Sequence, residues 1–323
     1  MKKLTIEVLR GDIVESVHNV NAVVSTADGV IEAWGDAGSP TIARSAIKSV
    51  QAIPLLACGA ADAFSLTDEE LGLACASHNA EPRHIEAVTA WLDRVGLDAG
   101  SLECGPSRPI GVAAADALVA RGQQFEPIHN CCSGKHAGFL SIAQHIGVDP
   151  RGYIGIDHPV QKLVTAAVET FAGVSLDGAS HGIDGCGIPV FAIPVRNLAL
   201  AMARLVKPLG VPAEMAEAAQ RLAAVLPAVS FWVSGTDRAE VDIAAAATEP
   251  IIAKTGAEGV FMAALPERGI GIALKAHDGA RRAAEVAIGA VLHRLGALPE
   301  PVPQPTIPNT LGQHVGRYVV HFS

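Results

Sequence analysis

Strand-like segments lie near both ends of this 323-residue chain, and helical patterns fill most of the region between them. Residues 3–9 and 20–25 are the early strand candidates, and residues 258–264 and 269–276 are the late ones. Only a short Pro- and Gly-containing turn separates the late pair, which favours antiparallel pairing. The sequence therefore predicts an α+β fold whose antiparallel sheet is built from both ends of the chain.

The helical patterns cover about residues 40–230 and contain no internal repeat and no low-complexity linker. The length suits one large domain. We therefore expect a single domain over residues 1–323, with the helical region inserted between the segments that form the sheet.

Composition argues against several classes of protein. The net charge is −9 and lysines and arginines do not cluster, so the basic footprint of a nucleic-acid binder is missing. No apolar run approaches the ~20 residues of a membrane-spanning helix. The first apolar run is broken at Glu7 and Arg10, too early for a signal peptide. We expect a cytoplasmic protein with no membrane contact and with reduced cysteines.

A serine and a lysine lie three residues apart in a segment that has helical signals. Ser39 can cap a helix that begins at Pro40, and this helix would carry Ser45 and Lys48 on the same side. A neutral lysine can take the proton of a serine hydroxyl and make it nucleophilic. Taken alone, Ser-x-x-Lys more often marks a surface lysine beside a helical serine.

Two further short motifs follow in order. Ser77-His78-Asn79 is a Ser-x-Asn motif, and Lys254-Thr255-Gly256 is a Lys-Thr-Gly motif. The three motifs occur in this order in serine β-lactamases and penicillin-binding proteins. Together they predict a serine acyl-transfer site between the sheet and the helical region.

A longer block resembles a known family. The run Asn130-Cys-Cys-Ser-Gly-Lys-His-Ala-Gly138 resembles the Asn-Cys-Ser-Gly-Lys-His-x-Gly block of the bacterial asparaginase family typified by the inducible enzyme of Rhizobium. The family's fold is serine β-lactamase-like, in agreement with the short motifs. Further blocks that agree are Arg44-Ser45-x-x-Lys48, Ser77-His78 followed by Glu81, Asp184-Gly185-Cys186-Gly187 and Lys254-x-Gly-Ala-Glu-Gly259.

The resemblance implies hydrolysis of L-asparagine to L-aspartate and ammonia through a seryl acyl-enzyme. Ser45 would be the nucleophile and Lys48 its base, while Ser77 and Lys254 would form a second serine–lysine pair that relays protons. The resemblance also implies a homodimer. The residues expected to bind substrate or shape its site are Arg44, Glu81, His136 and Asp184.

The resemblance also implies a zinc ion held by Cys132, Lys135 and Cys186, with a water completing the shell and Asp184 supporting the site. Thiolates suit zinc, and three protein ligands plus water is the open arrangement of a site that meets substrate. A lysine must lose its proton to bind, and nearby cations would lower its pKa. Cys131 adjoins Cys132, and the spacing of the family block favours Cys132 as the ligand.

Two other functions remain open. The short motifs also fit a β-lactamase or D-Ala-D-Ala peptidase relative, although such enzymes act outside the cytoplasm and the chain shows no export signal. A non-catalytic zinc-binding protein of the same fold is the other alternative. Asn79-Ala80 stands where the family has a Ser-Gly-type pair, so the contact there differs.

Overall fold

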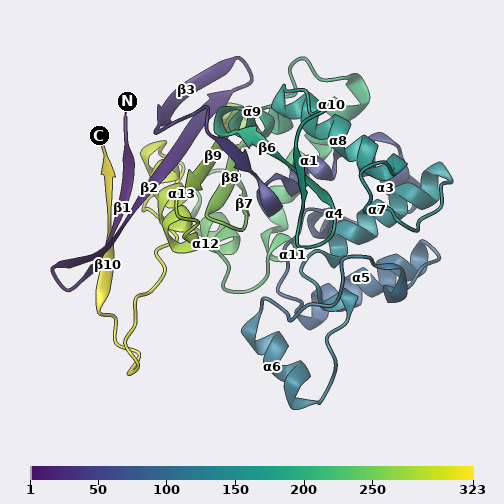
Figure 1. The fold of residues 1–323 in the computed structure, drawn as a ribbon, viewed down its shortest axis with the longest axis horizontal. Coiled ribbons are helices and arrows are strands. Elements are labelled where there is room, and N and C mark those ends of the chain that lie inside the picture. Colours follow the sequence, from purple (N-terminus) through teal and green to yellow (C-terminus); the bar gives the residue numbers. More distant parts are fainter. Residues whose placement is uncertain (1) are drawn as a thin grey trace.

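Among residues 2–323, which the computed structural model describes, seven strands form one antiparallel sheet at one side of the molecule (Figure 1). Its order is β10-β1-β2-β9-β8-β7, and β3 pairs with β2. The predicted sheet from both ends of an α+β chain is confirmed, although the sequence did not predict β3 or β10. The strands are β1 (Leu4–Arg10), β2 (Ile13–Thr26), β3 (Gly29–Trp34), β7 (Ile252–Thr255), β8 (Val260–Leu265), β9 (Ile270–Ala276) and β10 (Gly316–Phe322).

The long strand β2 joins the early and late parts of the sheet. Its first half pairs with β1, and its second half pairs with β9 on one side and β3 on the other. Successive side chains point to opposite faces. Val20, Ala22 and Val24 therefore pack towards α13 (Arg281–Arg294), whereas Val23 joins the larger core of the helical region.

Helix α9 (Val195–Val206) covers the face of the sheet opposite α13 and lies very close to β9. A Cβ atom at Gly271 would stand 2.2 Å from both the Ala199 carbonyl oxygen and the Ala203 nitrogen. Only glycine permits this approach, because any larger residue would push the helix off the strand. The helical region is thereby held directly against the sheet.

The helical region forms the larger of the two hydrophobic cores (Figure 1). Its helices are α1 (Lys48–Gln51), α2 (Ile53–Ala57), α3 (Ala60–Ala63), α4 (Asp68–Ala74), α5 (Pro82–Arg94), α6 (Val112–Ala120), α7 (Ser133–Ile146), α8 (Pro159–Ala172), α10 (Ala213–Val225), α11 (Ser230–Val233) and α12 (Ala239–Ala246). Short 3₁₀ turns are η1 (Arg44–Ile47), η2 (Ala99–Ser101), η3 (Pro127–His129), η4 (Leu226–Ala228) and η5 (Pro266–Arg268). A small second sheet consists of β4 (Pro40–Ile42), β6 (Pro189–Pro194) and β5 (His181–Ile183).

The predicted helix start at Ser39 and Pro40 is wrong. Pro40 to Ile42 form β4, which pairs antiparallel with the end of β6. Proline is acceptable there because it is the first residue of a short strand. Helical geometry begins only at η1, whose first residue, Arg44, has a left-handed backbone conformation with φ +51°. Strand pairing with a distant segment thus outweighs the local capping signal.

None of the helices formed by residues 2–323 is long and apolar enough to cross a membrane.

Candidate active site

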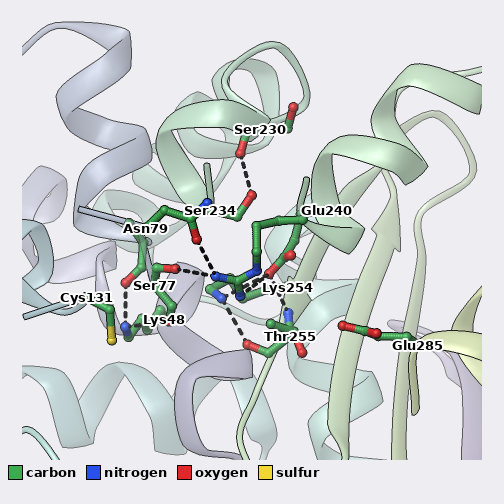
Figure 2. A network of polar contacts seen from close by, with 12 residues as sticks. Lys48, Ser77, Asn79, Cys131, Ser230, Ser234, Glu240, Lys254, Thr255 and Glu285 are labelled. Carbon is green, nitrogen blue, oxygen red and sulfur yellow. Dashed lines mark hydrogen bonds and ion pairs between the residues drawn. The ribbon is translucent and has the colours of Figure 1, made fainter. Parts of the chain in front are cut away.

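The amine of Lys48 lies fully buried where three segments meet. Lys48 opens α1, and its Nζ atom donates to Ser77 Oγ at 2.9 Å (Figure 2). The same atom donates to the Ala76 carbonyl and to Cys132 Sγ, the latter at 3.2 Å. Ala76 and Ser77 follow α4, and Cys132 precedes α7. The three contacts fix the amine in a site that is closed to bulk water.

Ser45 lies three residues before this lysine, on the 3₁₀ turn η1. Side chains three residues apart on such a turn lie one above the other, so the hydroxyl and the lysine stem share a side. Ser45 is half-buried, and its hydroxyl makes no hydrogen bond to any other described residue. The left-handed Arg44 immediately before it is a strained position of the kind that clusters at functional sites. The residue is therefore partly exposed, and its hydroxyl is uncommitted.

Ser77 pairs with Lys48 rather than with Lys254, which differs from the predicted second pair. Lys254 lies in β7, and its Nζ donates to Glu240 Oε1 at 3.2 Å and to the Thr255 carbonyl at 2.9 Å (Figure 2). Within residues 2–323, no hydrogen bond joins Ser77 to Lys254. The reason is electrostatic, since Lys254 turns to a buried carboxylate that balances its charge.

Burial sets the protonation of Lys254. It lowers the pKa of this side chain to about 8, with the nearby Lys48 acting in the same direction and Glu240 opposing both. A lysine with this pKa is partly neutral near physiological pH, so Lys254 can accept a proton as well as donate one.

Two charged residues that the sequence did not predict connect the lysines. Arg238 donates from Nη1 to the Ser77 carbonyl and to Asn79 Oδ1, each at 3.2 Å. Its Nη2 lies 4.0 Å from Glu240 Oε1, which also accepts from the Thr255 N–H at 3.0 Å. Both side chains are almost fully buried. No local pattern distinguishes a buried Arg or Glu from an exposed one.

Glu81 holds two segments of the site together. Its Oε1 accepts from the Thr236 N–H at 2.8 Å and from Asn79 Nδ2 at 3.1 Å, and its Oε2 accepts from Thr236 Oγ1 at 2.9 Å. Gly235 passes so close that a Cβ there would lie 2.7 Å from Glu81 Oε1. These contacts fix the loop that carries Arg238.

An open cleft of about 1530 Å³ lies beside this loop. Its walls come from α5, α6 and the segment around Thr236, and Glu81, Asn79 and Arg238 lie on its surface. The cleft is open to solvent and reaches Asn79, two residues after Ser77.

Cys132, Lys135 and Cys186 converge on the other side of Lys48. Lys135 Nζ lies 3.0 Å from Cys186 Sγ, and Cys132 Sγ lies 3.8 Å from Cys131 Sγ. Hydrogen bonds from Cys131 and Cys186 hold the pKa of the Cys132 thiol well below its usual range, and Lys48 and Lys135 act in the same direction. The arrangement favours a thiolate at Cys132.

Arg44 and Asp184 extend this cluster towards the surface. Arg44 Nε donates to Asp184 Oδ1 at 2.5 Å, and Asp184 Oδ2 accepts from the Cys186 thiol at 3.3 Å. The Arg44 side chain is 29% exposed and that of Asp184 only 7%. The predicted residues Arg44 and Asp184 therefore lie together beside Cys186, with the arginine facing outward.

His136 lies behind Lys135 and is fully buried. The Tyr153 hydroxyl oxygen accepts a hydrogen bond from the Glu103 N–H and lies 2.6 Å from His136 Nδ1. The hydroxyl hydrogen is free to be donated, and it is donated to His136 Nδ1. Burial lowers the pKa of His136 well below its usual range and keeps the ring neutral. The remaining proton is then on Nε2, which has no hydrogen-bond partner among the described residues.

The chemistry of these donors fits a zinc ion. A thiolate, a second thiol and an amine from two separate segments meet in a buried place, and zinc prefers sulfur and nitrogen ligands. Residues 2–323 contain no group of three or more His, Cys, Asp and Glu side chains arranged to hold a metal. A zinc ion here would therefore need Lys135 as its third protein ligand. Although burial lowers the pKa of Lys135, the neighbouring thiols raise it overall, so binding would have to displace a proton.

Comparison with known proteins gives one family and several similar structures. The model of the family described as L-asparaginase II matches residues 6–320. No curated protein matches the chain in sequence.

The similar solved structures include Mglu in its native form, with 15% identity and a TM-score of 0.48 over 86% of this chain. The matched part is 64% of the Mglu chain, so this chain spans less than two thirds of that protein. A Bacillus glutaminase has 13% identity and a TM-score of 0.44, covering 86% of this chain and 91% of its own. D-alanine carboxypeptidase AmpC from Burkholderia cenocepacia has 12% identity and a TM-score of 0.43, covering 86% and 93%.

Proposed function

Because the chain belongs to the L-asparaginase II family, we propose that it is an amidohydrolase that converts L-asparagine and water to L-aspartate and ammonia. The observation that carries this proposal furthest is the fixed, buried amine of Lys48 one turn after the uncommitted hydroxyl of Ser45. Nucleophile and base in this relation are the two parts that acyl transfer needs first.

In the proposed reaction, Ser45 Oγ attacks the side-chain amide carbon of L-asparagine and gives its proton to the Lys48 amine. The C–N bond of the tetrahedral intermediate then breaks, and the nitrogen leaves as ammonia after taking up a proton. The Ser77 hydroxyl, 2.9 Å from Lys48 Nζ, offers a path for that proton. Water hydrolyses the resulting ester and restores Ser45, with Lys254 as a second proton acceptor.

Substrate binding follows from the charges around the cluster. L-asparagine carries an α-carboxylate, and the guanidinium of Arg44 is a planar donor group suited to it. Asp184 holds Arg44 in place through its Nε atom. Glu81 supports the site by fixing the loop with Arg238 rather than by meeting the substrate directly.

The first test is ammonia release from L-asparagine by the purified protein, measured beside L-glutamine and a chromogenic β-lactam. We expect ammonia from L-asparagine and no opening of the β-lactam. Turnover of the β-lactam with no ammonia would instead support a serine β-lactamase or peptidase relative. Inactivity on all three substrates would contradict the amidohydrolase proposal and favour a non-catalytic zinc-binding protein.

We also propose that Cys132, Lys135 and Cys186 hold a zinc ion. When bound, the ion would supply a fixed positive charge next to the substrate site. The supporting observations are the convergence of the three side chains and the low pKa of Cys132. A homodimer and a cytoplasmic location stay predictions from the resemblance.

Removing one thiol is expected to release the metal. Cys132→Ser and Cys186→Ser should each weaken zinc binding by more than the roughly 10–100-fold that loss of a merely supporting residue costs. Elemental analysis of dialysed protein measures this without any assay of activity. Cys58→Ser is the matched control, since Cys58 is a free thiol packed against the core and should leave the zinc content unchanged. Equal zinc content in all three variants would refute the proposal that these residues hold zinc. The absence of zinc from the unaltered protein would refute it as well.

A further inference from the structure

Glu240 and Lys254 form a buried ion pair whose two members come from different elements. Glu240 lies in α12 and Lys254 in β7, and their side chains are 1% and 2% exposed. Glu240 Oε1 accepts both from Lys254 Nζ at 3.2 Å and from the Thr255 N–H at 3.0 Å. One carboxylate oxygen thus fixes the lysine amine and the strand that carries it (Figure 2).

The second oxygen of this carboxylate, Oε2, is buried and accepts no hydrogen bond from any described residue. Glu240 also lines a cavity of about 20 Å³, which is bounded in part by Ser49, Ser230 and Lys254. This volume is enough for one water molecule.

The surrounding charges show what Glu240 balances. The groups that face Lys254 are the cations Lys48 from α1 and Arg238 before α12, and the thiols Cys75 and Cys131 from the helical region. Three cations therefore lie close together in a place without bulk water, and Glu240 is the carboxylate in contact with two of them, Lys254 and Arg238. Without it the amine of Lys254 would be repelled by its two cationic neighbours.

We propose that Glu240 is a positioning residue of the active site. Its carboxylate holds the amine of Lys254 in place and stabilises the protonated form of that amine when it takes up a proton during the reaction. The inference rests on the proposed function, in which Lys254 accepts a proton during hydrolysis. Glu240 itself does not touch the substrate, because it acts through the lysine.

The sign of the expected effect follows from the charges. Burial lowers the pKa of Lys254 to about 8, and Glu240 raises it from what burial alone would give. Since the neutral amine is the active form, activity should rise with pH through this pKa. Loss of the negative charge would let the pKa fall further, and the rising limb would move to lower pH by about one unit or more.

The test is the pH dependence of kcat/KM for L-asparagine in the unaltered protein and in Glu240→Gln, which keeps the side-chain size and an oxygen for the two donors. We expect a rising limb near pH 8 that moves to lower pH in the variant. Glu70→Gln is the matched control, because Glu70 is an equally buried carboxylate paired with Arg94 outside the site. Its limb should stay where it is in the unaltered protein. An unmoved limb in Glu240→Gln would overturn the proposal.

A second variant and a second readout separate this inference from the proposed function. Glu240→Asp keeps the charge but shortens the side chain, so it should lower kcat with the limb near its original pH. A limb that moves as far as that of Glu240→Gln would contradict the assigned role. NMR titration of the Lys254 side chain, assigned with Lys254→Met, reports the same change in pKa without any turnover. A protein with no asparaginase activity but with the expected NMR change would refute the function and keep the pairing.

Discussion

Ser45→Ala is expected to lower ammonia release from L-asparagine by on the order of 10⁴-fold or more, with little change in the free energy of unfolding. The hydroxyl is the proposed nucleophile, so its removal abolishes the acyl-enzyme. Stability should change little because Ser45 is half-buried and its hydroxyl has no hydrogen-bond partner within the described part of the chain. Alanine also suits the helical turn.

Steady-state ammonia release and mass spectrometry of quenched reactions check this result. The unaltered protein should show an adduct whose mass corresponds to an aspartyl ester on the peptide with Ser45, and the variant should show none. Ser39→Ala is the control, since Ser39 is another half-buried serine in the same stretch and should retain nearly full activity. An active Ser45→Ala variant would require another nucleophile, of which Ser77 is the nearest to Lys48.

Lys48→Arg is expected to be nearly as inactive as Ser45→Ala, although it preserves the positive charge. Arginine stays protonated at any pH at which the protein is folded, so it cannot take the proton of Ser45. Its fork of donors also does not fit the buried place between Ala76, Ser77 and Cys132. Lys48→Arg therefore shows whether the reaction needs Lys48 as a base or only as a fixed positive charge.

Activity of Lys48→Arg and Lys48→Met is measured together with their unfolding in urea. Both should lose activity, and Lys48→Met should also lose about 1–3 kcal/mol of unfolding free energy because the Ala76 carbonyl loses its donor. Retention of more than a tenth of the activity by Lys48→Arg would mean that the cation, rather than the base, is what the reaction uses.

Local sequence patterns predicted much of the secondary structure. The strands near both ends and the largely helical region between them follow from periodicity and from turn residues, which are local properties. The pattern at Ser39 and Pro40 was misleading, because β4 exists only through its pairing with β6, a segment about 150 residues away. Strands β3 and β10 also depend on partners that no local pattern shows.

The residues of the site also fall into those that local motifs predicted and those that they did not. The three motifs and the family block predicted Ser45, Lys48 and the cysteine cluster, and the structure brings these segments together. The hydrogen bond from Lys48 to Ser77 and the pair formed by Arg238 and Glu240 were not predicted. These contacts depend on which charged side chains become buried, and burial is decided by tertiary packing rather than by neighbours in the sequence.

The pairing of β2 has a consequence for biosynthesis. During translation β1 and β2 emerge first, whereas β9 and β10, which cover the open edges of this hairpin, emerge last. At about 5–20 residues per second the ribosome needs on the order of ten seconds or more to reach β9. Throughout that interval the nascent hairpin offers unpaired strand edges and an uncovered apolar face to other chains. The same topology that joins the early and late strands thus leaves the growing polypeptide open to aggregation until β9 and β10 have been made.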